Sequence, residues 1–157
     1  MLGQITPVFE TVAARRPLVS GQGATRTINA NESGSTFLFD RAAGIVYTLP
    51  TATPGAFFDF VVTTTVTTNA HKVITAAGTE LLIGGYTSVD TDTSNAVAFH
   101  SGNGSTHVAV NMTPAGTNAL GGMVGTRLRF TCLSSTRWEV EGVNMAAGTP
   151  ATAFATS

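Results

Sequence analysis

Two glutamates are the residues of this sequence whose types and spacing come closest to a catalytic arrangement. Glu139 and Glu141 flank Val140 in the strand-like run "RWEVEGV", so both carboxylates fall on one face of a strand. A facing pair of carboxylates can serve as acid and base in glycoside hydrolysis. Two glutamates on one strand more often form a solvated polar face, so we expect no catalytic residues and no enzyme activity.

Possible metal ligands are scattered through the chain. The histidines, His71, His100 and His107, lack the i, i+4 helical spacing of zinc ligands. The expected polar loop 86–95, "YTSVDTDTSN", offers oxygen ligands for calcium from Asp90, Asp92 and Asn95. It lacks the glycine and terminal glutamate of the helical calcium loop. We expect no metal and no cofactor, and cation binding by the 86–95 loop is left open.

The charge balance limits the partners that the chain can recognise. Charged residues make up 11% of the 157 residues, and the net charge is −1. A nucleic-acid binder needs a basic surface, which scattered arginines and a single lysine, Lys72, do not supply. A surface with few charges suits a subunit that contacts other protein chains. We therefore expect protein partners and no nucleic acid.

Membrane and redox features are also missing from the sequence. No run approaches the roughly 18 apolar residues of a membrane helix. The opening "MLGQITPVFETVAARR" places its arginines after the apolar residues, unlike a secretory signal. Cys132 is the only cysteine, and we interpret it as a small buried apolar residue. We expect no membrane association and a chain synthesised in a cytoplasm.

These side chains must be positioned by short strand-like segments, in which apolar and polar residues alternate with a period of two. They are separated by Gly, Asn and Ser turns at spacings of roughly 8–14 residues, a pattern typical of β-sandwiches and barrels. The sequence predicts an all-β fold, a single antiparallel β-sandwich or jelly-roll-like β-barrel at 24–157, with a small-residue tail at 145–157. The expected core residues are Phe37, Phe39, Tyr47, Leu49, Phe58, Phe60, Phe130 and Trp138.

Turn residues predict how the strands connect. The segments 40–44, 100–106 and 133–138 have the composition of hairpin loops, and Asn103-Gly104 accepts the positive φ angles of a tight hairpin.

The segment 44–60, "GIVYTLPTATPGAFFDF", reads as two core strands joined by a rigid corner. Pro50 and Pro54 fix this corner. The second strand is expected to continue through the threonines that follow, over 56–68.

Residues 1–23 differ from the rest of the chain. Pro17 stops any long helix, and the apolar residues are isolated. We interpret the segment as an extended N-terminal arm that binds another subunit, with a frayed terminus as the alternative. The candidate contact residues are the apolar Val8, Phe9, Val12 and Leu18 and the basic Arg15 and Arg16.

The order of the strand-like segments resembles a known family. Between residues 35 and 144, "STFLFDRAAGIVYTLPTATPGAFFDFVV" is followed by "HKVITAAGTELLIGG" and then "GGMVGTRLRFTCLSSTRWEVEGV". This order resembles the small β-rich structural domains of tailed-bacteriophage virions. Such domains occur in capsid decoration (cement) proteins, head fibres and some tail components.

The resemblance implies a structural role on the virion. A decoration protein of this kind binds the outer face of the major capsid protein lattice as a homotrimer and stabilises the head. The chain is then made in the host cytoplasm and located on the outer capsid surface, with the arm reaching over the capsid or a neighbouring protomer. The alternative is a head-fibre or tail receptor-binding module for bacterial surface glycan, with Trp138 and Tyr86 as candidate aromatics.

Overall fold

The computed structural model describes residues 16–92, 96–114 and 116–157. In this part of the chain, strands account for all regular structure except one short 3-10 helix. The elements are β1 (Leu18–Val19), β2 (Thr25–Thr27), η1 (Ala30–Glu32), β3 (Thr36–Phe39), β4 (Ile45–Thr48), β5 (Phe57–Val62), β6 (His71–Ile74), β7 (Leu81–Asp90), β8 (Val97–Ser101), β9 (Ala109–Met112), β10 (Arg127–Ser134), β11 (Arg137–Ala146) and β12 (Phe154–Ala155).

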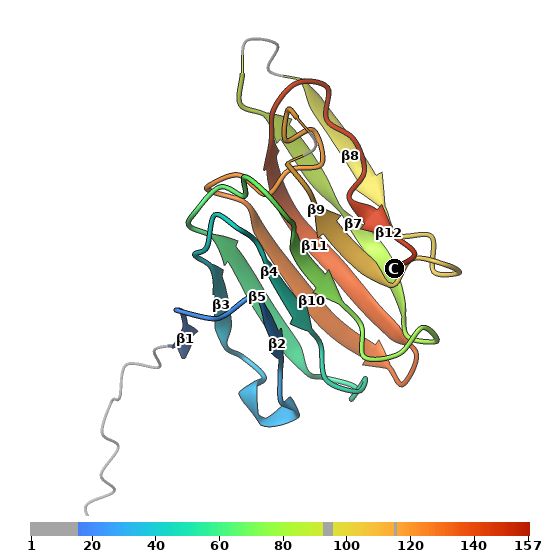
Figure 1. The fold of residues 1–157 in the computed structure, drawn as a ribbon. Helices are drawn as coiled ribbons and strands as arrows, with labels where there is room; N and C mark the ends of the chain where they lie inside the picture. The colour runs from blue at the N-terminus through green and yellow to red at the C-terminus, as the bar shows by residue number, and fades with distance from the viewer. Residues whose placement is uncertain (1–15, 93–95, 115) are drawn as a thin grey trace, which may run out of the picture.

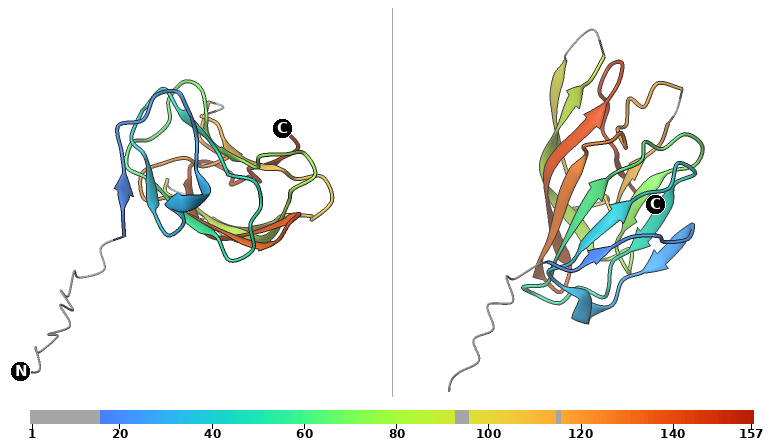
Figure 2. Two further views of the ribbon diagram at one scale, coloured as in Figure 1. Left: turned by 90° about the horizontal axis from the view of Figure 1, so that it is seen from below. Right: turned by 90° about the vertical axis from the view of Figure 1, so that its left-hand side faces the viewer.

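The strands form two sheets that pack face to face (Figures 1 and 2). The seven-stranded sheet has the order β1-β3-β5-β10-β11-β7-β8, and the five-stranded sheet has the order β12-β9-β6-β4-β2. Both sheets are open in the described part of the chain, so the fold is a β-sandwich and not a closed barrel. The predicted all-β class is confirmed.

The predicted antiparallel, jelly-roll-like pairing is wrong, because both sheets are mixed. The β10–β11 pair is antiparallel, whereas β3 pairs with β5, β4 with β6, and β7 with β11 in parallel. The cause is the path of the chain between layers. β3 and β5 belong to one sheet and the intervening β4 belongs to the other, so β3 and β5 run the same way when they meet.

The connections show the same switching between layers. Of the three segments predicted to be hairpin loops, 133–138 makes a hairpin, between β10 and β11, as expected. The other two segments, 40–44 and 100–106, join β3 to β4 and β8 to β9, and each crosses from the seven-stranded to the five-stranded sheet. The hairpin predictions for them are wrong, because turn residues reverse the chain without specifying which sheet receives the next strand.

The core lies between the layers and is rich in aromatic rings. Phe37, Phe60 and Tyr47 meet at ring-centroid distances of 5.4–5.6 Å across the two sheets. The Tyr47 hydroxyl donates a hydrogen bond to the Leu38 carbonyl at 2.7 Å, which satisfies its polar atom inside the core. All the expected core residues are buried: Phe37, Phe39, Tyr47, Leu49, Phe58, Phe60, Phe130 and Trp138.

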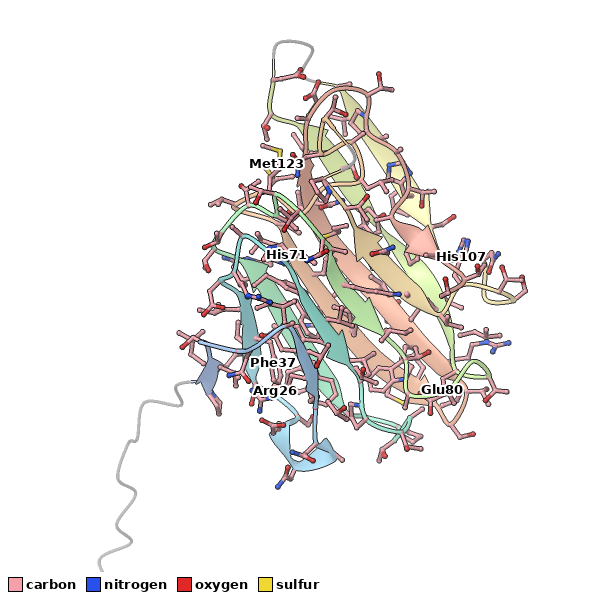
Figure 3. All side chains as sticks on the ribbon, in the orientation of Figure 1. Arg26, Phe37, His71, Glu80, His107 and Met123 are labelled. Atoms are coloured by element: carbon pink, nitrogen blue, oxygen red, sulfur yellow. The ribbon has the colours of Figure 1, made fainter. Side chains whose placement is uncertain are left out.

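The 44–60 corner joins β4 in one sheet to β5 in the other. Glu80, labelled in Figure 3, holds this corner, because its carboxylate accepts hydrogen bonds from the Ala52 amide at 2.9 Å and from Trp138 Nε1 at 3.2 Å. The expected long strand over 56–68 ends earlier, at Val62. The amides of the next two threonines both donate to the Phe39 carbonyl, which turns the chain towards the other sheet.

The expected polar loop 86–95 is strand as far as Asp90. Tyr86, Ser88 and Asp90 are buried on the inner face of β7. The alternation of buried and outward-facing side chains therefore continues to the end of the strand, although the inward residues there are polar. The polar composition hid this continuation in the sequence. Its structural reason is the long parallel pairing of β7 with β11, which runs from Leu81 to Asp90.

The C-terminal tail returns to the sandwich through Phe154. This side chain is buried and stacks between Tyr86 at 5.1 Å and His107 at 5.5 Å. The Tyr86 hydroxyl also accepts a hydrogen bond from the Ala153 amide at 2.6 Å. These contacts place β12 at the edge of the five-stranded sheet, beside β9.

Candidate binding surface

The predicted arm residues fall largely outside the described part of the chain. Val8, Phe9, Val12 and Arg15 lie in residues 1–15, which the structure does not describe. Arg16 and Leu18 lie inside it, and β1 already belongs to the seven-stranded sheet. Pairing of Leu18 with Thr36 therefore starts the sheet within the expected arm boundary of residue 23.

Arg16 and Leu18 lie on the outer face of the seven-stranded sheet. Leu18 is 64% exposed. Arg16 forms an ion pair with Asp59 of the same chain.

Asp59 organises a charged cluster on this outer face. It lies on β5 directly opposite Arg129 of β10. Arg129 donates from Nε to Oδ1 at 2.6 Å and from Nη2 to Oδ2 at 3.0 Å, a bidentate arrangement. Arg16 donates to Oδ2 as well. The Asp59 carboxylate is thus held between two guanidinium groups.

Phe57 completes this cluster. The guanidinium carbons of Arg129 and Arg16 lie 5.4 Å and 5.8 Å from the centre of the Phe57 ring, within the range of cation–π contact. Hydrogen bonding to Asp59 raises the pKa of Arg129, while desolvation by burial acts in the opposite direction. The cluster therefore keeps Arg129 charged and fixed in place.

Two shallow depressions adjoin the cluster. The larger, of about 450 Å³, lies over β10 and β11 and is lined by Arg127, Glu141 and Val143 among others. The smaller, of about 280 Å³, is lined by Arg16, Asp59, Arg127 and Arg129 among others. Arg127 borders both depressions and makes no ion pair within the described residues.

A row of outward-facing side chains crosses the same face, and we call it the outer band. Strand registers place its members side by side from β3 to β8, as Leu38, Val61, Arg127, Val143, Thr87 and Phe99. Neighbours of its central members along the strands, such as Phe60, Leu128 and Asn144, are buried in the core, so the band faces away from the other sheet. Phe99 is 69% exposed and Val143 is 41% exposed. The band is apolar or uncharged apart from Arg127.

The aromatic residues considered for glycan binding are buried. Trp138 is 0% exposed and Tyr86 is 1% exposed, so neither can stack on a sugar at the surface. Neither residue can therefore serve as the candidate aromatic of the glycan-binding alternative, because both point inwards in the strand alternation. The expected place of Trp138 in the core is confirmed.

The carboxylates considered as catalytic groups or metal ligands make contacts with neighbouring groups of the fold. Glu141 lies 4.0 Å from Arg129 on the outer face, and its side chain is 64% exposed. Asp92 accepts a hydrogen bond from the Gly148 amide at 2.8 Å, and Asp90 accepts one from the Asp92 amide at 3.0 Å. Among the described residues, no group of three His, Cys, Asp or Glu side chains could hold a metal ion.

Sequence reasoning missed the Asp59 cluster. The available signal was a carboxylate within the apolar run "AFFDFVV", since a half-buried charge requires a partner. The partner could not be named, because the pairing of β5 with β10 joins positions separated by 70 residues.

No protein-family model, no curated protein and no solved structure matches this chain. Within the described ranges, no helix has the length and apolar character that crossing a membrane requires.

Proposed function

We propose that this chain is a structural protein of a tailed-bacteriophage virion, and specifically a capsid decoration protein. In this role it binds the outer face of the major capsid protein lattice as a homotrimer and stabilises the head. The resemblance over residues 35–144 and the charge-poor composition support this role. The observation that carries it is the outer face of the seven-stranded sheet, where, among the described residues, exposed apolar side chains lie beside the fixed charges of the Asp59 cluster.

Such a surface fits a protein partner. An exposed apolar patch on a soluble domain commonly marks a contact surface, and a rigid guanidinium cluster adds directional hydrogen bonding. The Asp59 cluster is fixed before any partner binds, because its members already satisfy one another. Binding would then require little reordering of these long side chains, which lowers its entropic cost.

Stabilisation of the head follows from linkage. A protein that binds the assembled lattice and not loose capsid subunits shifts the equilibrium against disassembly. Three linked copies bind more tightly than one, because the second and third contacts form at high effective concentration.

Co-sedimentation with capsids tests the proposal. We expect the purified full chain to pellet with expanded capsids at a saturable copy number and to raise the temperature at which they release DNA. Unexpanded shells are the matched control. Binding to neither form would contradict the proposal. Saturable binding to a bacterial glycan array without capsid binding would favour the fibre or tail module instead.

A further inference from the structure

The outer band combines one positive charge with apolar side chains on both sides of it. Its single charge, Arg127, lies between Val61 on one side and Val143 on the other. Arg127 makes no ion pair within the described part of the chain, although Asp59 and Glu141 line the same depression. A complementary segment would carry one carboxylate flanked by apolar residues.

Phe99 forms the end of the outer band on the edge strand β8. Its side chain lies over Gly85, because a Cβ atom added at Gly85 would come 2.6 Å from Phe99 Cζ. The missing side chain at Gly85 therefore lets the Phe99 ring settle onto the sheet while leaving the residue 69% exposed. Val97, on the same edge strand β8, is 66% exposed. The ring offers an apolar platform to a partner.

We propose that the outer band binds residues 1–15 of a second copy of this chain. Glu10 is the only acidic residue in residues 1–23, and it is flanked by Val8, Phe9 and Val12. In the docked arrangement Glu10 pairs with Arg127, and the flanking apolar residues cover the apolar parts of the band. This inference rests on the proposed homo-oligomer and names the surface that receives each arm.

The length of the segment fits this assignment. Seven strands spaced about 4.8 Å apart make a sheet roughly 29 Å wide. Fifteen residues reach up to about 50 Å when extended. The segment ends next to Arg16, which Asp59 holds near the β1 edge. An arm that starts there can leave its own sheet and still cross the outer band of a neighbour.

A chain that carries both the arm and the band that receives it can form a closed ring of copies. The arm and the band are different surfaces, so the contact between copies is heterologous and joins them head to tail. Three such contacts close a ring in which each copy gives one arm and receives one. Closure would cover the outer band of every copy and would leave the Asp59 cluster, which lies in the adjacent row of the same face, for the proposed capsid contact.

Disulfide trapping between separately made variants tests the contact. Glu10→Cys and Arg127→Cys chains are purified, mixed and oxidised without capsids. We expect a two-chain product on a non-reducing gel. The matched control mixes Glu10→Cys with Lys72→Cys, which lies on the five-stranded sheet, and should give none. The native Cys132 is buried, so the unmodified chain provides the background.

Two outcomes of this trapping would overturn the inference. One is the absence of a two-chain product. The other is a Glu10→Cys/Arg127→Cys chain that closes an intrachain disulfide while the mixed single variants do not link, since the arm would then fold back on its own sheet.

Charge reversal gives an independent measurement by analytical ultracentrifugation. We expect Glu10→Arg and Arg127→Glu each to raise the dissociation constant of the oligomer roughly tenfold, as for the loss of a modest ion pair. The double variant should return towards the unmodified value, whereas Lys72→Glu should leave it unchanged. Additive loss in the double variant would count against the pairing. These measurements involve no capsid, so an arm contact that forms in a chain with no capsid affinity would sink the proposed function alone.

Discussion

Asp59 shows how one residue can order a surface. Its carboxylate is almost covered, at 8% exposure for the whole residue, yet it points towards the outer face between Phe58 and Phe60. Such a charge is tolerated only with partners, and Arg129 and Arg16 supply them. The same pairing holds both arginines near the Phe57 ring. The charges therefore stabilise the fold and define the surface together.

The Asp59→Asn substitution should destabilise the domain. It keeps the size of the side chain but removes the charge-assisted bonds to both guanidinium groups, at a cost of about 1–3 kcal/mol. Urea unfolding measures this change. Arg16→Ala is the comparison, and because the Arg16 side chain is 52% exposed its loss should cost less. If Asp59→Asn and Arg16→Ala lowered the free energy of unfolding equally, the bidentate contact with Arg129 would not be the main stabilising interaction of Asp59.

His71 illustrates a buried residue with one satisfied nitrogen. Its Nε2 lies 2.8 Å from the Thr64 carbonyl, which can only accept, so Nε2 carries the proton. Its Nδ1 has no hydrogen-bond partner among the described residues. Burial lowers the pKa of His71 from 6.5, although the Thr64 contact and the charge of Asp40 act in the opposite direction. The neutral ring is the form that fits the core.

Stability should therefore fall in mild acid. The unfolded chain takes up a proton on His71 near pH 6.5, whereas the folded chain does so only at lower pH, because its pKa is lowered. The contribution is fully present above about pH 6.5 and is lost as the pH falls towards the folded-state pKa. Urea unfolding between pH 8 and pH 5 measures it.

His71→Gln should flatten this pH dependence in part. Burial also lowers the pKa of His100, so some dependence should remain until His100 is replaced too. An identical pH profile in the His71→Gln variant would show that another group is responsible.

At the scale of elements, β11 is the strand on which the seven-stranded sheet depends. It pairs with β10 in an antiparallel hairpin and with β7 in parallel. Its inward Asn144 donates to the Leu120 carbonyl at 3.0 Å and accepts from Thr126 Oγ1 at 3.2 Å, which fixes the loop leading into β10. β11 therefore contacts three parts of the fold: β10 in the hairpin, β7 in the long parallel pair, and the loop that precedes β10.

Gly142 allows β11 to approach β10. Its φ angle is +143°, and an added Cβ atom would lie 2.1 Å from the Arg127 carbonyl oxygen. We expect Gly142→Ala to destabilise the domain by about 1–3 kcal/mol through backbone strain alone, with the steric clash adding to this. Thermal unfolding provides the measurement.

Gly23→Ala is the matched control. An added Cβ atom there meets nothing within 4 Å, and the backbone φ is not positive. The melting temperature of this variant should stay close to that of the unmodified protein. A Gly142→Ala chain as stable as the Gly23→Ala chain would show that β11 can move away from β10 at little cost.

At the scale of the whole molecule, the two faces of the sandwich have different roles. The inner faces hold the aromatic core, and the outer face of the seven-stranded sheet presents Arg127 and exposed apolar side chains. A rigid body with such a face is suited to assembly, because its contact residues are positioned by strand pairing and not by flexible loops.

Assembly should make stability depend on concentration. If arms join the copies, folding and association are linked, and the melting temperature of the full chain rises with protein concentration. Deleting residues 2–15 keeps Arg16 and its ion pair with Asp59, so the domain itself should stay folded. The shortened chain should melt at a temperature independent of concentration. A concentration dependence that survives the deletion would place the contact between copies elsewhere.

Local pattern determined the class of this fold and its core. Alternation with a period of two needs only neighbouring residues, so it marked Phe37, Phe39, Phe58 and Phe60 as inward-facing and predicted an all-β domain. The 133–138 hairpin was predictable for the same reason, since its strands are adjacent in sequence.

Strand neighbours, in contrast, were decided by tertiary structure. Whether 40–44 closes a hairpin or crosses to the other sheet depends on where the next strand finds its pairing partner, which no local pattern encodes. The Asp59–Arg129 contact and the outer band also arise from registers between distant strands. The sequence alone determined which side chains face inwards, and long-range pairing decided which outward side chains share a surface.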